Sequence, residues 1–382
     1  MSGRNDGNGG RRKRVAVIVT EYRYNSHADV IVGRLLGDFG YEPELAAASI
    51  YTDQVPDNDM SREMAARHGV PIYPTIAEAV RAPHLDSPID GVLIIGEHGD
   101  YPTNEKRQKM YPRCRLLRET LAALDDLGLR VPIFSDKHLS YDPDEAEWMY
   151  AQLKRRGIPF FGGSSIPHTD PVPAYDASLL GGAREWLVVS FSTSVEAYGY
   201  HALEVLQSIA EKRDGGEKGV RRVWALEGAD VWEAMDRGEW PEALMHAALS
   251  VYDGLPEGHP RETQTEPVLF AVEYDDGCKG YVVQFRDLIE QWGYAFRGGD
   301  GSVTAARCNS ETDRPFGHFG RLTRLIETFV ATGEPPCPME RILYSTGLIN
   351  AGMASLYLQR PIDTAGLRIP YGQGHACANA RE

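Results

Sequence analysis

Cysteine is scarce in this 382-residue chain and never occurs in closely spaced pairs. No C-x-x-C motif is present, and the five cysteines stand far apart, at Cys114, Cys278, Cys308, Cys337 and Cys377. This spacing argues against a disulfide framework and against a structural zinc site, which needs clustered thiolates. We expect reduced thiols and a cytoplasmic location.

Long apolar runs and an excess of basic charge are absent as well. No stretch approaches the roughly 18 to 20 apolar residues that span a bilayer, and no apolar secretory segment follows the basic residues 11–14. The formal net charge of −15 argues against binding to a nucleic-acid backbone. We therefore expect a small-molecule partner, no nucleic acid and no membrane, with residues 1–13 as a disordered tail.

The first half of the chain alternates short apolar runs with helical segments. Continuous runs such as "RVAVIVT" and "DGVLIIGE" are typical of strands buried on both faces of a parallel sheet. Segments such as "DEAEWMYAQLKRRG" between them have a helical pattern. This alternation predicts an α/β fold, with a doubly wound parallel sheet over residues 14–170.

The second half changes character. Its apolar runs, "AREWLVVSFS", "RRVWALEG", "VLFAVEYDDG" and "KGYVVQF", predict strands, with longer helices between or after them. Asp275–Gly277 supply the turn of a hairpin that joins the last two of these strands. We expect residues 171–382 to form an α+β domain with an open, mainly antiparallel sheet.

Three histidines follow successive predicted strands of the first half: His98, His138 and His168. In a doubly wound sheet such loops gather at the carboxyl edge, where ligands bind. With nearby carboxylates, these imidazoles offer ligands that zinc, manganese or iron accept. Two interpretations stay open: a divalent metal site, or loop residues that serve as caps and turns.

Three tyrosines lie near the same loops: Tyr101, Tyr141 and Tyr175. Aromatic rings are suitable platforms for sugars, so they are candidate substrate-binding residues. The chain has nineteen tyrosines, and chance proximity is the competing explanation.

Several segments in a fixed order carry a family resemblance. "AARHGVPIYPTIAEAV", "DGVLIIGEHGDYP", "SDKHLSYDPDEAEWM" and "FGRLTRLIETFVATGEPPCPMERILYSTGLINAGMASL" together resemble the glucose-fructose oxidoreductase and inositol dehydrogenase superfamily, Gfo/Idh/MocA. The resemblance covers most of residues 14–360. It implies a Rossmann-like first domain, a second domain for substrate binding and oligomerisation, and a homo-oligomer.

The resemblance also implies catalytic residues. Asp136, Lys137 and His138 stand where the family has a Glu-Lys-Pro turn, so Lys137 would relay a proton at the reacting oxygen and Asp136 would neighbour it. "SVEAYGYHALEVL" is similar to the family's helix with an aspartate and a histidine four residues apart. His201 matches the histidine, but the aspartate position falls on Ala197.

The turn after the first strand departs from the family's pattern. A dinucleotide site needs glycines there so that backbone N–H groups can approach the diphosphate, whereas this chain has "TEYRYNSHAD". Arg23 could pair with a phosphate, Ser26 could cap the helix beneath it, and Asp53 could hold a ribose hydroxyl. Against them stand bulky side chains and the charge of Glu21, so we expect weak NAD(P) binding or none.

These observations predict an oxidoreductase-family enzyme that acts on a sugar, a cyclitol or a related polyol or keto compound. Its dependence on a nicotinamide cofactor is left open by the turn. One alternative is a metal-assisted lyase, hydrolase or isomerase that uses the former cofactor cleft. A second alternative is a non-catalytic binding protein.

Overall fold

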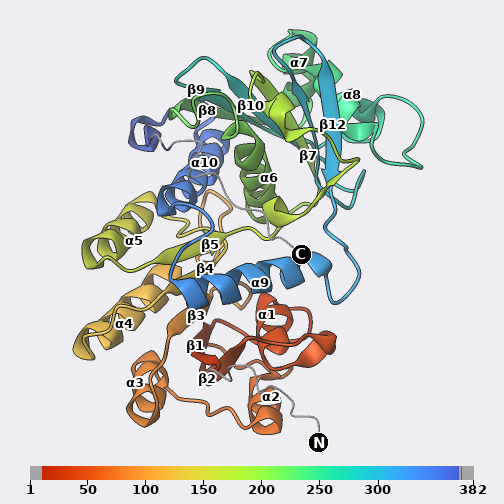
Figure 1. The fold of residues 1–382 in the computed structure, drawn as a ribbon. Helices are drawn as coiled ribbons and strands as arrows, with labels where there is room; N and C mark the ends of the chain where they lie inside the picture. Colours follow the sequence, from red (N-terminus) through yellow and green to blue (C-terminus); the bar gives the residue numbers. More distant parts are fainter. Residues whose placement is uncertain (1–10, 370, 372–382) are drawn as a thin grey trace, which may run out of the picture.

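The computed structural model describes residues 11–369 and 371, which form two sheets with helices packed around and between them (Figure 1). The first sheet is wholly parallel and has the order β2-β1-β3-β4-β5. Its strands are β1 (Lys13–Val19), β2 (Leu45–Thr52), β3 (Gly91–Ile95), β4 (Ile133–Asp136) and β5 (Phe160–Gly163). The helices that connect them are α1 (His27–Leu35), α2 (Ser61–His68), α3 (Ile76–Asp86), α4 (Arg113–Asp126) and α5 (Pro143–Arg156).

Local chemistry sets the bounds of these elements. The side chains from Val15 to Val19 are fully buried, as their continuous apolar run predicts for a central parallel strand. The side chain of Asp142 accepts a hydrogen bond from the N–H of Glu145 and so caps α5, which begins at Pro143. The same helix ends at Gly157, whose φ of +61° suits glycine.

The second sheet is mixed and mainly antiparallel. Its eight strands have the order β13-β8-β9-β10-β7-β11-β12-β6, and the β7–β10 pair is parallel. The predicted hairpin is present, with β9 and β10 antiparallel around Asp275–Gly277. The strands are β6 (Pro171–Val172), β7 (Glu185–Ser190), β8 (Val220–Glu227), β9 (Val268–Tyr274), β10 (Lys279–Gln284), β11 (Gly293–Arg297), β12 (Val303–Cys308) and β13 (Ile362–Asp363).

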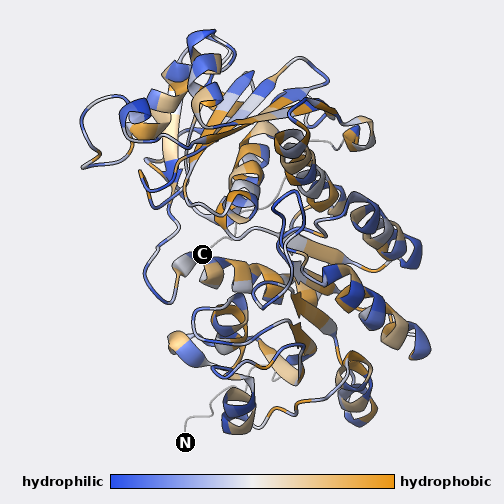
Figure 2. Cartoon of the chain, turned by 180° about the vertical axis from the view of Figure 1, so that it is seen from behind, coloured by the Kyte–Doolittle hydropathy of each residue, from blue (hydrophilic) through white to orange (hydrophobic). Residues whose placement is uncertain are grey.

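Helices cover both faces of this second sheet. On the inner face lie α6 (Val195–Ala210) and α10 (Met339–Leu358), and on the outer face lie α7 (Ala229–Asp236) and α8 (Glu242–Leu249). The hydrophobic parts of the ribbon in Figure 2 include the strands and the inward helix faces. The resemblance implies a homo-oligomer, and α7 and α8 cover the outer face of the second sheet within the chain. The oligomer itself stays a prediction.

Helix α9 (Gly317–Thr332) follows the second sheet in sequence but packs on the first. Its Phe329 is fully buried, with its ring centroid 5.9 Å from that of Phe161 on β5. Residues of α10 then pack against the other face of the same sheet. The C-terminal helices therefore hold the two sheets together.

The predicted fold class, a Rossmann-like parallel sheet followed by an α+β part, is confirmed. The predicted tail at 1–13 lies mostly outside the described residues, and Lys13 already begins β1. The predicted boundary at residue 170 falls between β5 and β6. None of the described helices is long and apolar enough to cross a membrane.

The cysteines follow the expectation only in part. Cys114, Cys278 and Cys308 are free and buried, whereas Cys337 is disulfide-bonded, so the expectation of reduced thiols is wrong there. Cys377 lies outside the described residues.

Because α9 packs on the first sheet, its central aromatic side chain should contribute strongly to the stability of the fold. Replacing Phe329 with alanine should lower the free energy of unfolding by about 3–5 kcal/mol, because the cavity left behind is fully enclosed. Thr328→Ala, at an exposed position of the same helix, is the matched control and should change little. Urea unfolding followed by circular dichroism measures both, and equal midpoints would contradict the assigned role of α9.

Candidate functional site

A cavity of about 380 Å³ lies at the carboxyl edge of the first sheet, facing the start of α6. The loop between β3 and α4, the turn after β4 and the first turn of α6 supply its lining. The lining residues are Glu97, Thr103, Arg107, Lys109, Tyr111, Lys137, His138, Thr193, Ser194, Val195, Glu196 and Ala197. This is the position at which α/β sheets bind ligands.

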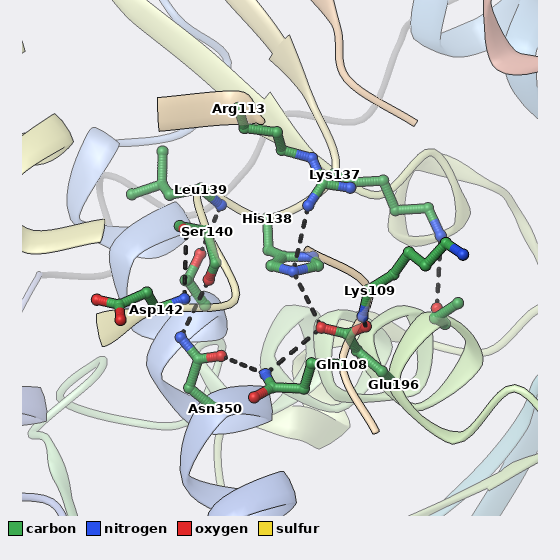
Figure 3. Close-up of polar contacts among 12 residues, drawn as sticks. Gln108, Lys109, Arg113, Lys137, His138, Leu139, Ser140, Asp142, Glu196 and Asn350 are labelled. Carbon is green, nitrogen blue, oxygen red and sulfur yellow. Dashed lines mark hydrogen bonds and ion pairs between the residues drawn. The ribbon is translucent and has the colours of Figure 1, made fainter. Parts of the chain in front are cut away.

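Lys137 reaches from the first sheet to α6 (Figure 3). It directly follows β4 and has a left-handed backbone, with φ of +65°, which is uncommon for a residue with a side chain and typical of functional turns. Its ammonium is buried, 3.4 Å from Oε1 of Glu97, and it donates to the carbonyl of Ala197 at 3.5 Å. The lysine predicted from the resemblance thus contacts α6 at the position of the missing aspartate.

Glu97 lies between two cations in this buried site. Its Oε2 accepts a hydrogen bond from Arg113 at 2.5 Å, while its Oε1 faces Lys137. Burial alone would raise the pKa of Glu97, but the charges of Lys137 and Arg113 outweigh burial and hold that pKa well below its usual range. The carboxylate is therefore charged at neutral pH.

His138 belongs to a network behind the cavity. Its Nε2 lies 3.3 Å from Nη1 of Arg113 and 3.5 Å from Oε1 of Glu196 on α6. Burial and the charge of Arg113 lower the pKa of His138. Gln108 extends the network to α10 by donating to Asn350 at 2.8 Å. These contacts fix the turn that carries Lys137 to both helices of the second sheet.

His201 and Asp136 occupy positions next to this site but do not line the cavity. His201 lies one turn after Ala197, with its Nδ1 2.6 Å from Oγ of Ser164. Burial and the charge of Lys137 place the pKa of His201 well below its usual range. Asp136 binds Nδ1 of His27 on α1 at 2.6 Å, so it fastens α1 to β4.

The three histidines predicted as metal ligands do not converge. His98 contacts Arg23 at 3.3 Å and the ring of His27, whereas His168 packs on Phe161. Burial lowers the pKa of His98 and of His168 to about 3. Among the described residues, the side chains placed to share a metal ion are Glu242, His246 and His259, far along the chain. All three histidines follow strands of the first sheet and therefore lie at one sheet edge, but their side chains do not point toward a common position.

The predicted tyrosines do not line the cavity either. Tyr101 donates to Asp53 at 2.7 Å, Tyr175 packs on Tyr294, and Tyr141 is half-buried at the start of α5. Tyr111, which the sequence reasoning missed, does line it, with its ring 4.8 Å from the guanidinium of Arg113. Nothing in the local sequence separates Tyr111 from the other tyrosines of the chain.

The side chains expected to hold a dinucleotide are engaged within the chain. Arg23 pairs with Glu21, and Ser26 caps α1 by accepting from the N–H of Asp29. The third, Asp53, accepts hydrogen bonds from three side chains at 2.6 to 2.7 Å: Tyr51, Tyr101 and Arg115.

The turn itself leaves no glycine cradle. Tyr22 is fully buried in its middle, where the backbone would have to approach a diphosphate. His27, at the start of α1, is bonded across to Asp136. The residues present do not fit a dinucleotide held in the usual manner of this fold.

No family model and no curated protein matches the sequence. Solved structures do match along nearly the whole chain. GenD2 from gentamicin A biosynthesis, in complex with NAD, has 13% identity and a TM-score of 0.60 over 95% of this chain and 99% of that chain. Scyllo-inositol dehydrogenase from Lactobacillus casei has 11% identity and a TM-score of 0.59, with 93% and 99% covered. A probable dehydrogenase from Thermotoga maritima has 15% identity and a TM-score of 0.58, also with 93% and 99% covered.

The chain has the fold of these dehydrogenases. The comparisons thus support the resemblance to the Gfo/Idh/MocA superfamily at the level of the fold. At such identities the likeness does not reach the chemistry, because one fold can host many activities.

The charge cluster predicts a pH-dependent stability. Glu97→Gln keeps the shape but leaves Lys137 and Arg113 buried without a counter-charge, which should cost about 3–5 kcal/mol of unfolding free energy at neutral pH. Because the folded-state pKa of Glu97 is lowered, its contribution is complete above the unfolded-state pKa, about 4.3, and is lost as pH falls toward the folded-state value. The difference between wild type and variant should therefore shrink below about pH 4.

Denaturant unfolding over a range of pH measures this difference. Glu119→Gln is the control, since Glu119 is exposed on α4 and pairs with Arg115 at 3.1 Å. It should cost no more than about 0.5 kcal/mol. A Glu97 variant as stable as that control would show that the cluster does not stabilise the fold.

The side chains of the β1–α1 turn are already bonded within the chain, which predicts poor dinucleotide binding. NAD(H) and NADP(H) should bind with dissociation constants no tighter than about 1 mM, equivalent to about 4 kcal/mol. Calorimetric titration of the purified protein measures this directly. Micromolar affinity for either cofactor would mean that the turn rearranges and that the dehydrogenase site is intact.

Proposed function

We propose that this chain is an enzyme of the oxidoreductase family that acts on a sugar, a cyclitol or a related polyol or keto compound in the Lys137 cavity. The observation that carries the proposal is the buried ammonium of Lys137, held by Glu97 at one end of a cavity of about 380 Å³. The dehydrogenase neighbours support the oxidoreductase kind, and several of the solved structures are inositol dehydrogenases by name.

The lining suits a substrate with several hydroxyl groups. Thr193, Ser194 and Tyr111 offer hydroxyls that can both donate and accept hydrogen bonds. In this proposal Lys137 holds an ammonium at the oxygen of the reacting carbon, where it can donate a proton to a carbonyl or stabilise the negative charge on an alkoxide. Glu97 fixes the direction of the ammonium and balances its charge.

This chain differs from its structural neighbours in whether its first sheet has room for a nicotinamide cofactor. Hydride transfer requires a carrier such as the NAD bound by GenD2, and the β1–α1 turn of this chain does not fit one. The same lysine supports a redox-neutral reaction, because an ammonium that donates a hydrogen bond to a keto oxygen acidifies the neighbouring C–H bond, whose proton then passes to solvent water. The engaged turn favours this second candidate: isomerisation or elimination on a keto sugar or keto cyclitol. The histidines at the sheet edge do not converge, so no metal takes part in the proposal.

Exchange of a carbon-bound proton tests the proposal without a cofactor. Wild-type protein should catalyse incorporation of deuterium from D₂O beside the keto group of scyllo-inosose or of a ketose, followed by proton NMR. Lys137→Met should lower the rate by about 10²-fold or more, the usual scale for removing a positioned acid or base. Methionine keeps the apolar stem, and Glu97 keeps its hydrogen bond from Arg113, so the fold should persist with a lower free energy of unfolding.

Lys106→Met is the matched control, because Lys106 belongs to the β3–α4 loop and does not line the cavity. A parallel assay supplies NAD(P)⁺ and a polyol and follows NAD(P)H by absorbance. Turnover only in that second assay would establish the dehydrogenase reaction in place of the redox-neutral one. Turnover that Lys137→Met leaves unchanged would overturn the role of Lys137, and no turnover in either assay would favour the non-catalytic binding protein.

A further inference from the structure

A second lysine lines the cavity and has no acidic partner among the described residues. Lys109 is half-buried at the cavity wall, and its backbone N–H donates to Oε2 of Glu196 at 2.8 Å. Its side-chain ammonium, unlike that of Lys137, faces no carboxylate. Figure 3 shows the ammonium ends of Lys109 and Lys137 directed toward the same side of the site.

The carboxylates that line the cavity are already engaged. Glu97 is held between Lys137 and Arg113, and Glu196 faces the backbone of Lys109 and the ring of His138. The charge of Lys109 is therefore left without a counter-charge from the lining. A cation that is partly withdrawn from water gains from an anionic ligand that enters the cavity with it.

The cations become more exposed from the inner end of the cavity to its mouth. The side chain of Lys137 is 4% exposed, Lys109 is half-buried, and the side chain of Arg107 is 52% exposed and pairs with Glu227 at 2.8 Å. Arg107 also lines an adjoining cavity of about 400 Å³, so the space continues outward past it. Ser194, which precedes α6 and also lines the cavity, makes no capping bond with its side chain.

We infer that the substrate carries an anionic group, a carboxylate or a phosphate, that Lys109 binds while the hydroxylated or keto carbon lies at Lys137. Arg107 and the start of α6 add donors at the same end. This inference rests on the proposed function for the reacting end of the substrate. It narrows the substrate class from polyols in general to sugar acids or phosphorylated sugars.

Binding of three probes tests the inference. D-glucose is the neutral probe, D-gluconate carries a carboxylate and glucose 6-phosphate carries a phosphate, and titration calorimetry measures their affinities. One of the anionic probes should bind at least about tenfold more tightly than glucose, since a charge-assisted hydrogen bond is lost with the neutral compound. Which of the two binds tells a carboxylate from a phosphate.

Lys109→Met should remove the preference for the anionic probe and leave glucose binding unchanged. Lys106→Met changes the charge of the same loop by the same amount without touching the cavity, so it should keep the preference. Equal losses in both variants, or an anionic probe that binds no better than glucose, would overturn the inference. The outcome is separate from the exchange assay: Lys109-dependent binding without Lys137-dependent exchange would overturn the proposed function alone.

Discussion

The buried charge cluster of Glu97, Lys137 and Arg113 is the constraint on which the candidate site depends. It joins the end of β3, the turn after β4 and the start of α4, and through Lys137 it reaches the backbone of α6. Removing these charges from water is costly, and the cost is offset only while all three remain together. The same requirement that holds the cluster together therefore also holds an ammonium at the edge of a cavity.

A second set of contacts closes the neighbouring part of the same sheet edge. His27 binds Asp136, Arg23 pairs with Glu21, and the carboxylate of Asp53 accepts three hydrogen bonds. These are the positions at which dinucleotide-binding sheets leave polar groups for the ligand. In this chain the groups satisfy one another instead. The two parts of this sheet edge therefore differ: one holds the buried ammonium of Lys137 beside a cavity, and the other is filled by the protein's own side chains.

The fold was predictable because its signals are local. Runs such as residues 14–20, which are rich in β-branched residues, are typical of central parallel strands, and capping residues such as Asp142 mark where helices begin. The position of Lys137 came from the resemblance. Lys109 and Tyr111 were missed because the β3–α4 loop has no periodicity, and its path over the cavity is set by contacts from Gln108 to Asn350 and from the backbone of Lys109 to Glu196. Likewise, sequence placed His98, His138 and His168 at one sheet edge but could not give the directions of their side chains.

Under the proposed function, the β3–α4 loop selects the substrate. The sheet and α6 fix the distance across the cavity, since Lys137 bridges them, and they would do so for any substrate. The loop adds Arg107, Lys109 and Tyr111, which set what can lie beside that lysine. The contact of Lys137 with α6 and the β3–α4 loop are separate parts of the structure. A fold shared at 11% to 15% identity is therefore compatible with a different substrate. Change in the loop can alter the ligand while the buried charge cluster, and with it the fold, stays in place.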